Sequence, residues 1–497
     1  MRRAYTVPFL FALGLATCAA PQPGGPAAPD NRGTLLYRRH CTSCHGEDGG
    51  GETVAAEFLV PRPSPFGSGS FKLVSTTNGV PSEDDLVATL RRGMPGSTMM
   101  SWGWLPEADL RELAREVRRL AIRGLVASLL RTAAVAGQPL EPGQAMAQAE
   151  RELAPGPEIA LGTGALDGDP AVGREVFLRH CASCHGEDGR GLPATGAWPA
   201  TSAAWWSRDL TKSGLRGGGS PRDVAMRIRA GMPGAHMPPT PLSDVETGAL
   251  VAHVLRLLPP DGVRLVQLRR TLRAARVPRL PGDDSARPLA ELEPVLLPVV
   301  PLRWRPDAAD EVSVRAAHDG ADLMLRLDWT DASRDDLVQL DRAIGDGAAV
   351  QFTREGDPPL FAMGTASQPV SVWRWRSYGP KEMAGVLDLL DASRHVGLDV
   401  PSADWHPAPS TESVEFHGIE SARSATDSGL PLRVHTRWEA GRWTVAFRRP
   451  LRARSEREVD FERAGPVLFA LAVWDGRIDA HAGSKAITTW HVLELER

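Results

Sequence analysis

Hydrophobic and polar positions follow two different periods in the two parts of the chain. Up to about residue 260, apolar residues recur every three or four positions, as after Pro106, where Leu110, Leu113 and Val117 share one helical face. From about Leu302 onward, apolar residues alternate with polar ones or run at strand length between Gly, Asp and Pro. The pattern predicts helices first and strands afterwards.

Capping residues mark the starts of several predicted helices. Asp169 followed by Pro170 predicts a helix that runs toward Cys181. Three further pairs have the spacing of a capping box or start signal: Ser82 with Asp85, Ser220 with Asp223, and Ser243 with Glu246. The predicted helices assemble into two small all-α units of about 90 residues each.

The two helical units are copies of one another. Cys41-Thr-Ser-Cys44-His45 and Cys181-Ala-Ser-Cys184-His185 are each followed by Gly-Glu-Asp-Gly. A Gly-Met-Pro-Gly segment at 93–96 has its counterpart at 231–234. Both landmarks are offset by roughly 140 residues, which indicates a duplicated domain.

The Cys-x-x-Cys-His motif is typical of covalent haem attachment. The two thiols add to the haem vinyl groups, and the adjacent histidine ligates the iron. A zinc site would need a second pair of ligands nearby, whereas these pairs lie about 140 residues apart. We therefore predict two c-type haems, held by Cys41, Cys44, Cys181 and Cys184, with His45 and His185 as iron ligands.

A methionine-rich loop follows each motif and predicts the second iron ligand. The loops resemble the ligand loop of monohaem cytochromes c, in which the later methionine carries the sulfur, so Met99 and Met237 are the expected ligands. Met94, Met100, Met232 and His236 remain alternatives. His/Met ligation leaves no open coordination site, which favours electron transfer over catalysis at these irons. The Gly-rich segment after each histidine predicts tight turns around the haem edge.

Length, net charge and the N-terminal segment indicate how many domains the chain has and where in the cell it acts. The 497 residues predict about three domains, and a net charge of −4 argues against nucleic-acid binding. Residues 1–20 have the basic start and short apolar run of an export signal. Leu15-Ala16-Thr17-Cys18 resembles a bacterial lipobox, so Cys18 is either a lipidated N-terminus or a cysteine lost with the signal. No transmembrane helix is predicted.

Seven segments of the C-terminal part have strand-like patterns, and together they predict an antiparallel β-sandwich of about 190 residues. They are 312–318, 322–329, 348–353, 370–375, 432–438, 443–448 and 467–474.

This C-terminal part resembles a known haem domain. The segments Phe361-Ala-Met-Gly, 369–375, 471–476 and Gly483-Ser-Lys are similar to those of the haem b domain of ethylbenzene dehydrogenase, the γ subunit of type II dimethyl sulfoxide reductase-family molybdoenzymes. The resemblance implies one non-covalent haem b held between Met363 and Lys485. His435, His481 and His491 are alternative ligands, each expected to be packed or exposed instead.

The expected fold is multidomain: two all-α cytochrome c domains followed by an antiparallel β-sandwich haem-binding domain. The expected boundaries are 1–20 for the signal, 30–123 for the first cytochrome domain, 124–164 for a helical and Pro/Gly linker, 165–260 for the second cytochrome domain, 261–301 for a second linker with helical character to Val277, and 302–497 for the haem b domain.

These features predict an exported electron-transfer protein, periplasmic or lipid-anchored, that is not itself an enzyme. Two c haems and one b haem would relay electrons between a redox enzyme and respiratory partners. The resemblance implies molybdopterin and iron–sulfur subunits as partners. The competing interpretation is a haem enzyme of the dihaem peroxidase or nitrogen-oxide reductase type, which requires an iron with an open or displaceable ligand position.

Overall fold

The structure is a computed structural model. It describes residues 31–191, 207, 209–211, 214–235, 237–259, 268–281, 288–302, 308–335, 345–353, 363–365, 368–377, 411–416, 423–424, 432–453, 455–476 and 485–497. The predicted export signal with Cys18, and the alternative ligands His236 and His481, lie outside these residues.

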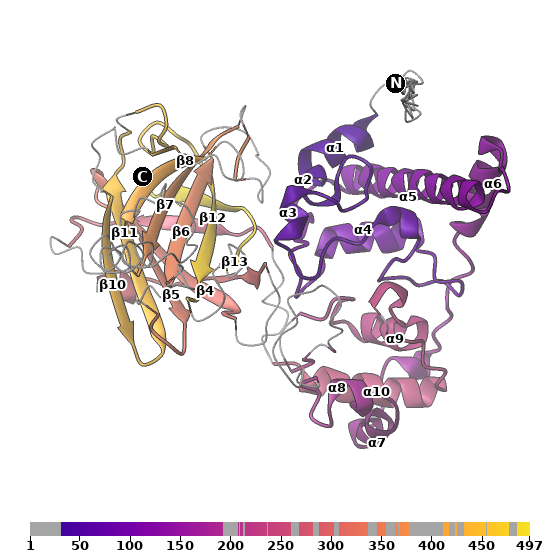
Figure 1. The fold of residues 1–497 in the computed structure, drawn as a ribbon. Helices are drawn as coiled ribbons and strands as arrows, with labels where there is room; N and C mark the ends of the chain where they lie inside the picture. Colours follow the sequence, from indigo (N-terminus) through magenta and orange to yellow (C-terminus); the bar gives the residue numbers. More distant parts are fainter. Residues whose placement is uncertain are drawn as a thin grey trace, which may run out of the picture.

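Helices build the first two parts of the chain (Figure 1). The first helical domain contains α1 (Arg32–His40), α2 (Thr42–His45), α3 (Val54–Glu57), α4 (Glu83–Arg92), α5 (Glu107–Val135) and α6 (Pro142–Glu152). The second helical domain contains α7 (Pro170–His180), α8 (Ala182–His185), α9 (Pro221–Ala230) and α10 (Asp244–Leu257).

The predicted helix starts are confirmed. Asp169 caps α7 by accepting a hydrogen bond from Ala171 N. The three predicted serine–acid pairs form complete capping boxes at the starts of α4, α9 and α10. Each box satisfies two backbone N–H groups that the first helical turn leaves without partners.

In each copy the helix that precedes the Cys-x-x-Cys-His motif crosses a later helix at a glycine. Gly33 of α1 lies against the backbone of Glu112 in α5, and Gly173 of α7 lies against the backbone of Ala249 in α10. A Cβ atom at either glycine would collide with that backbone. The two glycines are 140 residues apart, so the duplication extends to the packing of the helices.

Helix α5 is longer than the sequence pattern predicts. It runs for 29 residues and passes the expected domain boundary at residue 123 without a break. Its buried residues extend from Asp109 to Ala121, so its first half packs in the domain core. The second half of α5 packs against α6, in the segment where a linker was expected.

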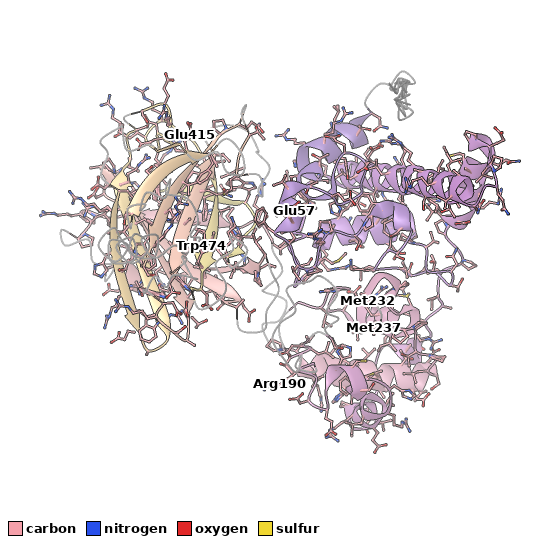
Figure 2. The ribbon with its side chains drawn as sticks, in the orientation of Figure 1. Glu57, Arg190, Met232, Met237, Glu415 and Trp474 are labelled. Atoms are coloured by element: carbon pink, nitrogen blue, oxygen red, sulfur yellow. The ribbon has the colours of Figure 1, made fainter. Side chains whose placement is uncertain are left out.

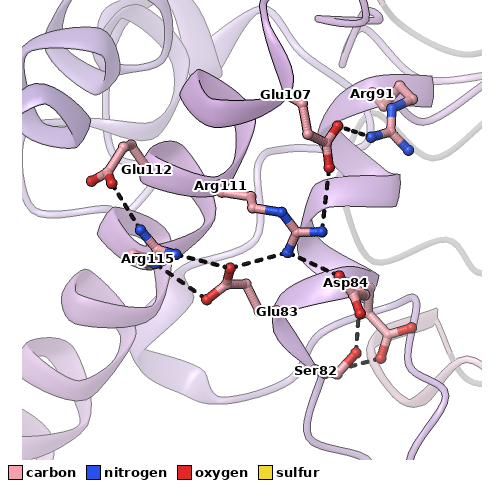
Figure 3. Close-up of polar contacts among 9 residues, drawn as sticks. Ser82, Glu83, Asp84, Arg91, Glu107, Arg111, Glu112 and Arg115 are labelled. Carbon is pink, nitrogen blue, oxygen red and sulfur yellow. Dashed lines mark hydrogen bonds and ion pairs between the residues drawn. The ribbon is translucent and has the colours of Figure 1, made fainter.

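Ion pairs between α4 and the first turns of α5 lie on the surface of the first helical domain (Figure 3). Arg111 bridges Glu83 at 3.2 Å and Asp84 at 3.0 Å, and Arg115 bridges Glu83 at 3.3 Å. These side chains are well exposed, so each pair stabilises the fold by less than about 1 kcal/mol. Buried apolar residues of α4 and α5, including Leu90 and Leu113, supply the main contact between the helices.

The C-terminal part is the β domain, in which fourteen strands are hydrogen-bonded into one network among the described residues. The strands are β1 (Thr271–Arg276), β2 (Val295–Pro298), β3 (Val300–Pro301), β4 (Glu311–His318), β5 (Asp322–Thr330), β6 (Gly347–Thr353), β7 (Val370–Arg376), β8 (Thr411–Phe416), β9 (Arg423–Ser424), β10 (Arg433–Glu439), β11 (Arg442–Pro450), β12 (Val467–Trp474), β13 (Lys485–Ile487) and β14 (His491–Leu495). Their main order is β10-β11-β5-β4-β1-β14-β12-β6-β7-β8-β9, and all seven predicted strands are present.

Two expectations about this domain are wrong. The sheet is mixed, because β1 pairs in parallel with both β14 and β4. Part of the expected linker 261–301 belongs to the sheet, since β1, β2 and β3 lie within it, and the helical character expected up to Val277 is a strand at β1. In β1 the residues Leu272 and Ala274 are buried between exposed ones, a period of two that an arginine-rich segment obscures.

Aromatic residues from distant strands meet in one core. Trp375 of β7 contacts Trp443 of β11 with ring centroids 4.9 Å apart. Trp373 of β7 lies 6.4 Å from Phe447 of β11. Since β7 and β11 lie near opposite ends of the strand order, the two arms of the network face each other across this core.

The first helical domain contacts both other parts of the chain. Its Val60 N donates to Leu302 O of the β domain at 2.8 Å, and its Phe71 O accepts from Gly234 N of the second helical domain at 3.3 Å. Figure 1 shows the β domain beside the stacked helical domains. Within the described residues, no helix has both the length and the apolar character needed to span a membrane.

Candidate haem sites

The first site lies where α1 gives way to α2. Cys41 ends α1, and its carbonyl accepts a hydrogen bond from His45 N at 2.9 Å. The short helix α2 therefore holds Cys41, Cys44 and His45 within one turn. Burial raises the pKa of Cys41 to about 12 and that of Cys44 to about 11, so both side chains are protonated thiols at pH 7.

A glycine turn supports the histidine, as the sequence predicts. Gly46, Gly49 and Gly51 each have φ of 75°, a left-handed conformation that favours glycine. The turn brings Gly51 N to the carbonyl of His45 at 2.9 Å. It also brings Phe66 against the imidazole, with ring centroids 4.8 Å apart and planes 23° apart. Gly51 thus fixes the backbone of His45, and Phe66 packs against its ring.

An apolar cavity opens in front of these three residues. Tyr37, Leu59, Phe71, Leu90 and other apolar side chains line it, together with Cys41, Cys44, His45 and the three methionines Met94, Met99 and Met100. Met99 packs against the core of the first helical domain, and its carbonyl accepts a hydrogen bond from Met94 N at 2.8 Å. The structure therefore brings the predicted histidine and methionine to one cavity.

The cavity residues fit a haem. The Nδ1 atom of His45 is buried with no hydrogen-bond partner, and burial lowers the pKa of His45 to about 4, with a contribution from nearby Lys72. The imidazole is therefore neutral at pH 7, which is the form that ligates iron. Cys41 and Cys44 would hold a haem covalently, and His45 and Met99 would ligate its iron.

The second site repeats this arrangement. Cys181 ends α7, His185 N donates to its carbonyl at 2.9 Å, and α8 carries Cys184 and His185. Gly191 N donates to the carbonyl of His185 at 2.7 Å, the counterpart of the contact at Gly51. Burial raises the pKa of Cys181 to about 11.

Two methionines lie side by side in the second helical domain, at the end of α9 (Figure 2). Met232 N donates to Met237 O at 2.8 Å, as Met94 N does to Met99 O in the first copy. Met232 is 9% exposed and packs in the domain interior. Met237, the predicted ligand, occupies the same position in its loop as Met99.

Met363 and Lys485, which are 122 residues apart in the chain, meet in the β domain. Lys485 Nζ lies 4.0 Å from Met363 Sδ. Typical metal–sulfur and metal–nitrogen bonds, as measured for zinc, sum to about 4.4 Å, so the spacing is close to what one metal ion between the two side chains requires. Met363 has φ of 47°, a strained backbone for a residue other than glycine, followed by Gly364 with φ of 80°.

Lys485 is suited to bind a metal. Burial lowers its pKa to about 8, with a further contribution from Arg374, which favours the neutral amine that a metal requires. Lys485 begins β13 and pairs with Trp474 at the end of β12. Apolar residues around Met363, including Trp490 and Trp474, form one cluster that could cover the face of a haem b.

The alternative histidines of the β domain have other surroundings. His491 is fully buried, and its Nδ1 accepts a hydrogen bond from Arg270 N at 3.1 Å. Burial lowers the pKa of His491 to about 3, with contributions from Arg270 and Arg269. His435 lies on β10, at one end of the strand order and several strands from β13.

Several residues of the sites have no signal in the sequence. Phe66, which stacks on His45, and Arg216, which reaches the first cavity from the second domain, belong to no motif. The ring of His40 lies near those of Trp102 and Trp104, with centroid distances of 5.0 and 5.6 Å. The counterpart in the second copy, His180, is exposed.

Comparison with protein families matches each part of the chain. Residues 170–258 match the model of cytochrome c, and residues 28–115 match that of cytochrome c oxidase, cbb3-type, subunit III. Residues 304–486 match the model of ethylbenzene dehydrogenase. The three matches fall on the second helical domain, the first helical domain and the β domain.

Three relatives share part of the chain. ORF7 of Haloferax mediterranei, named as a heme subunit of a respiratory nitrate reductase, is 27% identical over 37% of this chain and 58% of its own length. The dimethylsulfide dehydrogenase subunit gamma of Rhodovulum sulfidophilum is 26% identical over 46% of this chain and 81% of its own. The chlorate reductase subunit gamma of Ideonella dechloratans is 26% identical over 36% and 63%.

The chain thus spans less than two thirds of the length of two of these relatives. The family matches and the geometry of the sites agree on the type of each domain, and both bear out the resemblance stated from the sequence. The chain is made of two cytochrome c domains followed by an ethylbenzene dehydrogenase-like domain.

Proposed function

We propose that this chain is an exported, non-catalytic electron-transfer subunit that carries two covalent c haems and one b haem. The names of its relatives, which are haem or gamma subunits of redox enzymes, support this function. The β-sandwich interpretation of the C-terminal domain is supported by its two facing arms and their shared aromatic core. A molybdopterin subunit and an iron–sulfur subunit are the proposed partners.

The observation that carries the proposal is the contact between the first cytochrome domain and the β domain. Met100, the neighbour of the proposed ligand Met99, packs in one apolar cluster with Trp490 and with Met363, a proposed ligand of haem b. Thr489 Oγ1 donates to Met100 Sδ at 3.2 Å. The proposed ligand loop of the first c haem would thus contact the proposed pocket of haem b.

The first cytochrome domain would therefore lie between the other two domains in the path of electron transfer. It contacts the β domain through Met100 and the second cytochrome domain through Phe71 and Val74, which cluster with Met226 and Ala230 of α9. Electrons would pass between haem b and the second c haem through the first c haem.

The haem content tests the proposal directly. The chain is produced in a host that matures c-type cytochromes, and its haems are quantified by pyridine haemochrome spectra before and after acid–acetone extraction. We expect two c haems to one b haem, with only the b haem extracted. The Lys485→Gln variant should lose the b haem and keep both c haems, whereas Arg222→Gln, which removes a cation whose side chain is 58% exposed, should keep all three. Absence of b haem from the wild type, or of covalent haem, would refute the assignment.

Ligand binding distinguishes a relay from a haem enzyme. Each c-type iron is proposed to have both a histidine and a methionine ligand. Carbon monoxide should therefore not bind promptly to the reduced protein, and cyanide should not bind promptly to the oxidised protein. Rapid formation of a ligand complex at one haem would favour the enzyme instead.

A further inference from the structure

Basic side chains line the first haem cavity. In the part of the chain that the structure describes, the lining contains Arg62, Lys72 and Arg216, and neither an aspartate nor a glutamate. The rest of the lining is mostly apolar or hydroxyl-bearing. Positive charge enclosed in such surroundings is costly unless an anion balances it.

Two of these cations lie close enough to repel each other. Burial lowers the pKa of Lys72 to about 8, and Arg216 contributes to that lowering. Burial also lowers the pKa of Arg216, and no carboxylate offsets the effect. The Nε atom of Arg216 is buried without a hydrogen-bond partner, while Lys72 Nζ donates to the hydroxyl of Ser64. Among the described residues, no carboxylate pairs with either cation.

Arg216 belongs to the second cytochrome domain, and its backbone is hydrogen-bonded to the first. Arg92 of α4 donates from Nε to the carbonyl of Arg216 at 3.0 Å. Nearby, Gly234 of the second domain lies against the backbone of Ser70 and Lys72, where a Cβ atom would be 2.7 Å from Ser70 O. The interface thus holds Arg216 and Lys72 at one edge of the cavity.

We propose that Arg216 and Lys72 bind the two propionate carboxylates of the first c haem, so that the second cytochrome domain completes the haem pocket of the first. This inference rests on the proposed function, since it takes a haem in the cavity as given. Two carboxylates match two cations in charge, and a guanidinium can bind a carboxylate through two parallel hydrogen bonds. The contact also joins the two domains electrostatically beside the haem.

Redox titration of the two c haems tests this site. Loss of the Arg216 charge leaves the propionates less compensated, which stabilises the ferric state. In Arg216→Gln the midpoint potential of one c haem should fall, while that of the other stays unchanged. A unit charge about 10 Å from the iron at an effective dielectric constant near 20 changes the redox equilibrium on the order of tenfold, which is about 59 mV for one electron. Arg216→Lys, which keeps the charge, should recover most of the shift.

A matched control variant and a second measurement distinguish a propionate site from a general effect of substitution. Arg222→Gln removes an arginine of the second domain whose side chain is 58% exposed, and it should leave both potentials unchanged. The propionate-bending band in resonance Raman spectra should shift in Arg216→Gln and Lys72→Gln but not in Arg222→Gln. If Arg216→Gln keeps both c haems with unchanged potentials and an unchanged band, the propionate site is refuted while the proposed function stands. If no c haem is bound at all, the proposed function fails first.

Discussion

At the scale of single residues, each cytochrome loop offers more than one methionine near the iron position. In the first loop, Met94 and Met99 are both partly buried and both line the cavity. Met100 is 7% exposed and is directed to the β domain by its contact with Thr489. Side-chain surroundings therefore separate Met100 from the other two, and resemblance to known loops favours Met99.

Substitution of these methionines tests the assignment. In Met99→Ala we expect one of the two c haems to lose its methionine–iron charge-transfer band and to bind carbon monoxide, because the sulfur ligand is gone. The band should persist at both haems in Met94→Ala. Optical spectra of the oxidised protein measure this, and loss of the band in Met94→Ala alone would exchange the roles of the two residues.

A buried group of carboxylates gives the β domain a pH dependence. Asp331, Asp335, Asp346 and Asp475 have carboxylate oxygens within 4.8 Å of one another. Burial raises the pKa of Asp331 to about 8, with contributions from Asp346, Asp475 and Asp335. Burial also raises the pKa of Asp346 to about 6, although Gly476 N and Trp443 Nε1 donate hydrogen bonds to it.

The sign of the effect follows from proton binding. Between about pH 4 and pH 8 the folded state retains protons on Asp331 and Asp346 that the unfolded chain releases, so stability falls as pH rises through this window. In Asp331→Asn the thermal midpoint should rise by several degrees at pH 8 and change little at pH 4. Circular dichroism with a chelator present measures it, and Glu47→Gln, an exposed carboxyl, is the control. An equal response of both variants would contradict the explanation.

At the scale of elements, close helix crossings hold each cytochrome domain together. Gly33 allows backbone contact between α1 and α5, and Gly173 allows it between α7 and α10, which no larger side chain permits. The crossing fixes the direction in which α1 delivers Cys41 and α7 delivers Cys181. In each domain the same helix thus takes part in the crossing and carries the first cysteine of the motif at its end.

Enlarging one crossing glycine should destabilise its domain. Gly33→Ala places a methyl group against the backbone of Glu112, and overpacking of this kind costs about 1–3 kcal/mol. Gly143→Ala in α6, where a Cβ atom meets nothing within 4 Å, should be neutral or stabilising by up to about 1 kcal/mol. Denaturant unfolding and the yield of covalent haem measure the difference. A similar stability for both variants would show that the helices separate at little cost.

At the scale of the whole molecule, the first cytochrome domain connects the other two. Its contact with the β domain combines Met100, Trp102 and the strand residues around Trp490 in one cluster. Its contact with the second cytochrome domain combines apolar residues with Arg92 and Arg216. The order of the domains in space therefore differs from their order in the chain, where the second cytochrome domain lies between the other two.

Truncation of the interdomain methionine tests this arrangement. Met100→Ala should cost about 2–5 kcal/mol of packing at the cluster and slow electron exchange between haem b and the first c haem, because packed atoms between them are lost. Haem content and the methionine–iron band should be unchanged. Met146→Ala, at a side chain 39% exposed on α6, should change stability by less than about 0.5 kcal/mol. Rapid-mixing spectroscopy measures the exchange, and equal rates in both variants would contradict a route through Met100.

The sequence by itself determined the helix starts, the seven predicted strands, the duplication and the type of each domain. These features rest on local rules: capping boxes satisfy backbone groups within one turn, strand periodicity needs only neighbouring residues, and Cys-x-x-Cys-His brings its ligands together within one short helix. The resemblance also identified Met363 and Lys485, which the structure places 4.0 Å apart.

Only the tertiary structure determined the features that depend on contacts between residues distant in the chain. The parallel pairing of β1 with β14 joins residues more than 200 positions apart, so no local pattern could show that the expected linker continues the sheet. The position of Arg216 in the first haem cavity and of Met100 against Thr489 likewise results from contacts between domains. The candidate haem ligands can be identified from local sequence motifs. The charges and side chains that surround these ligands depend on how whole domains pack together.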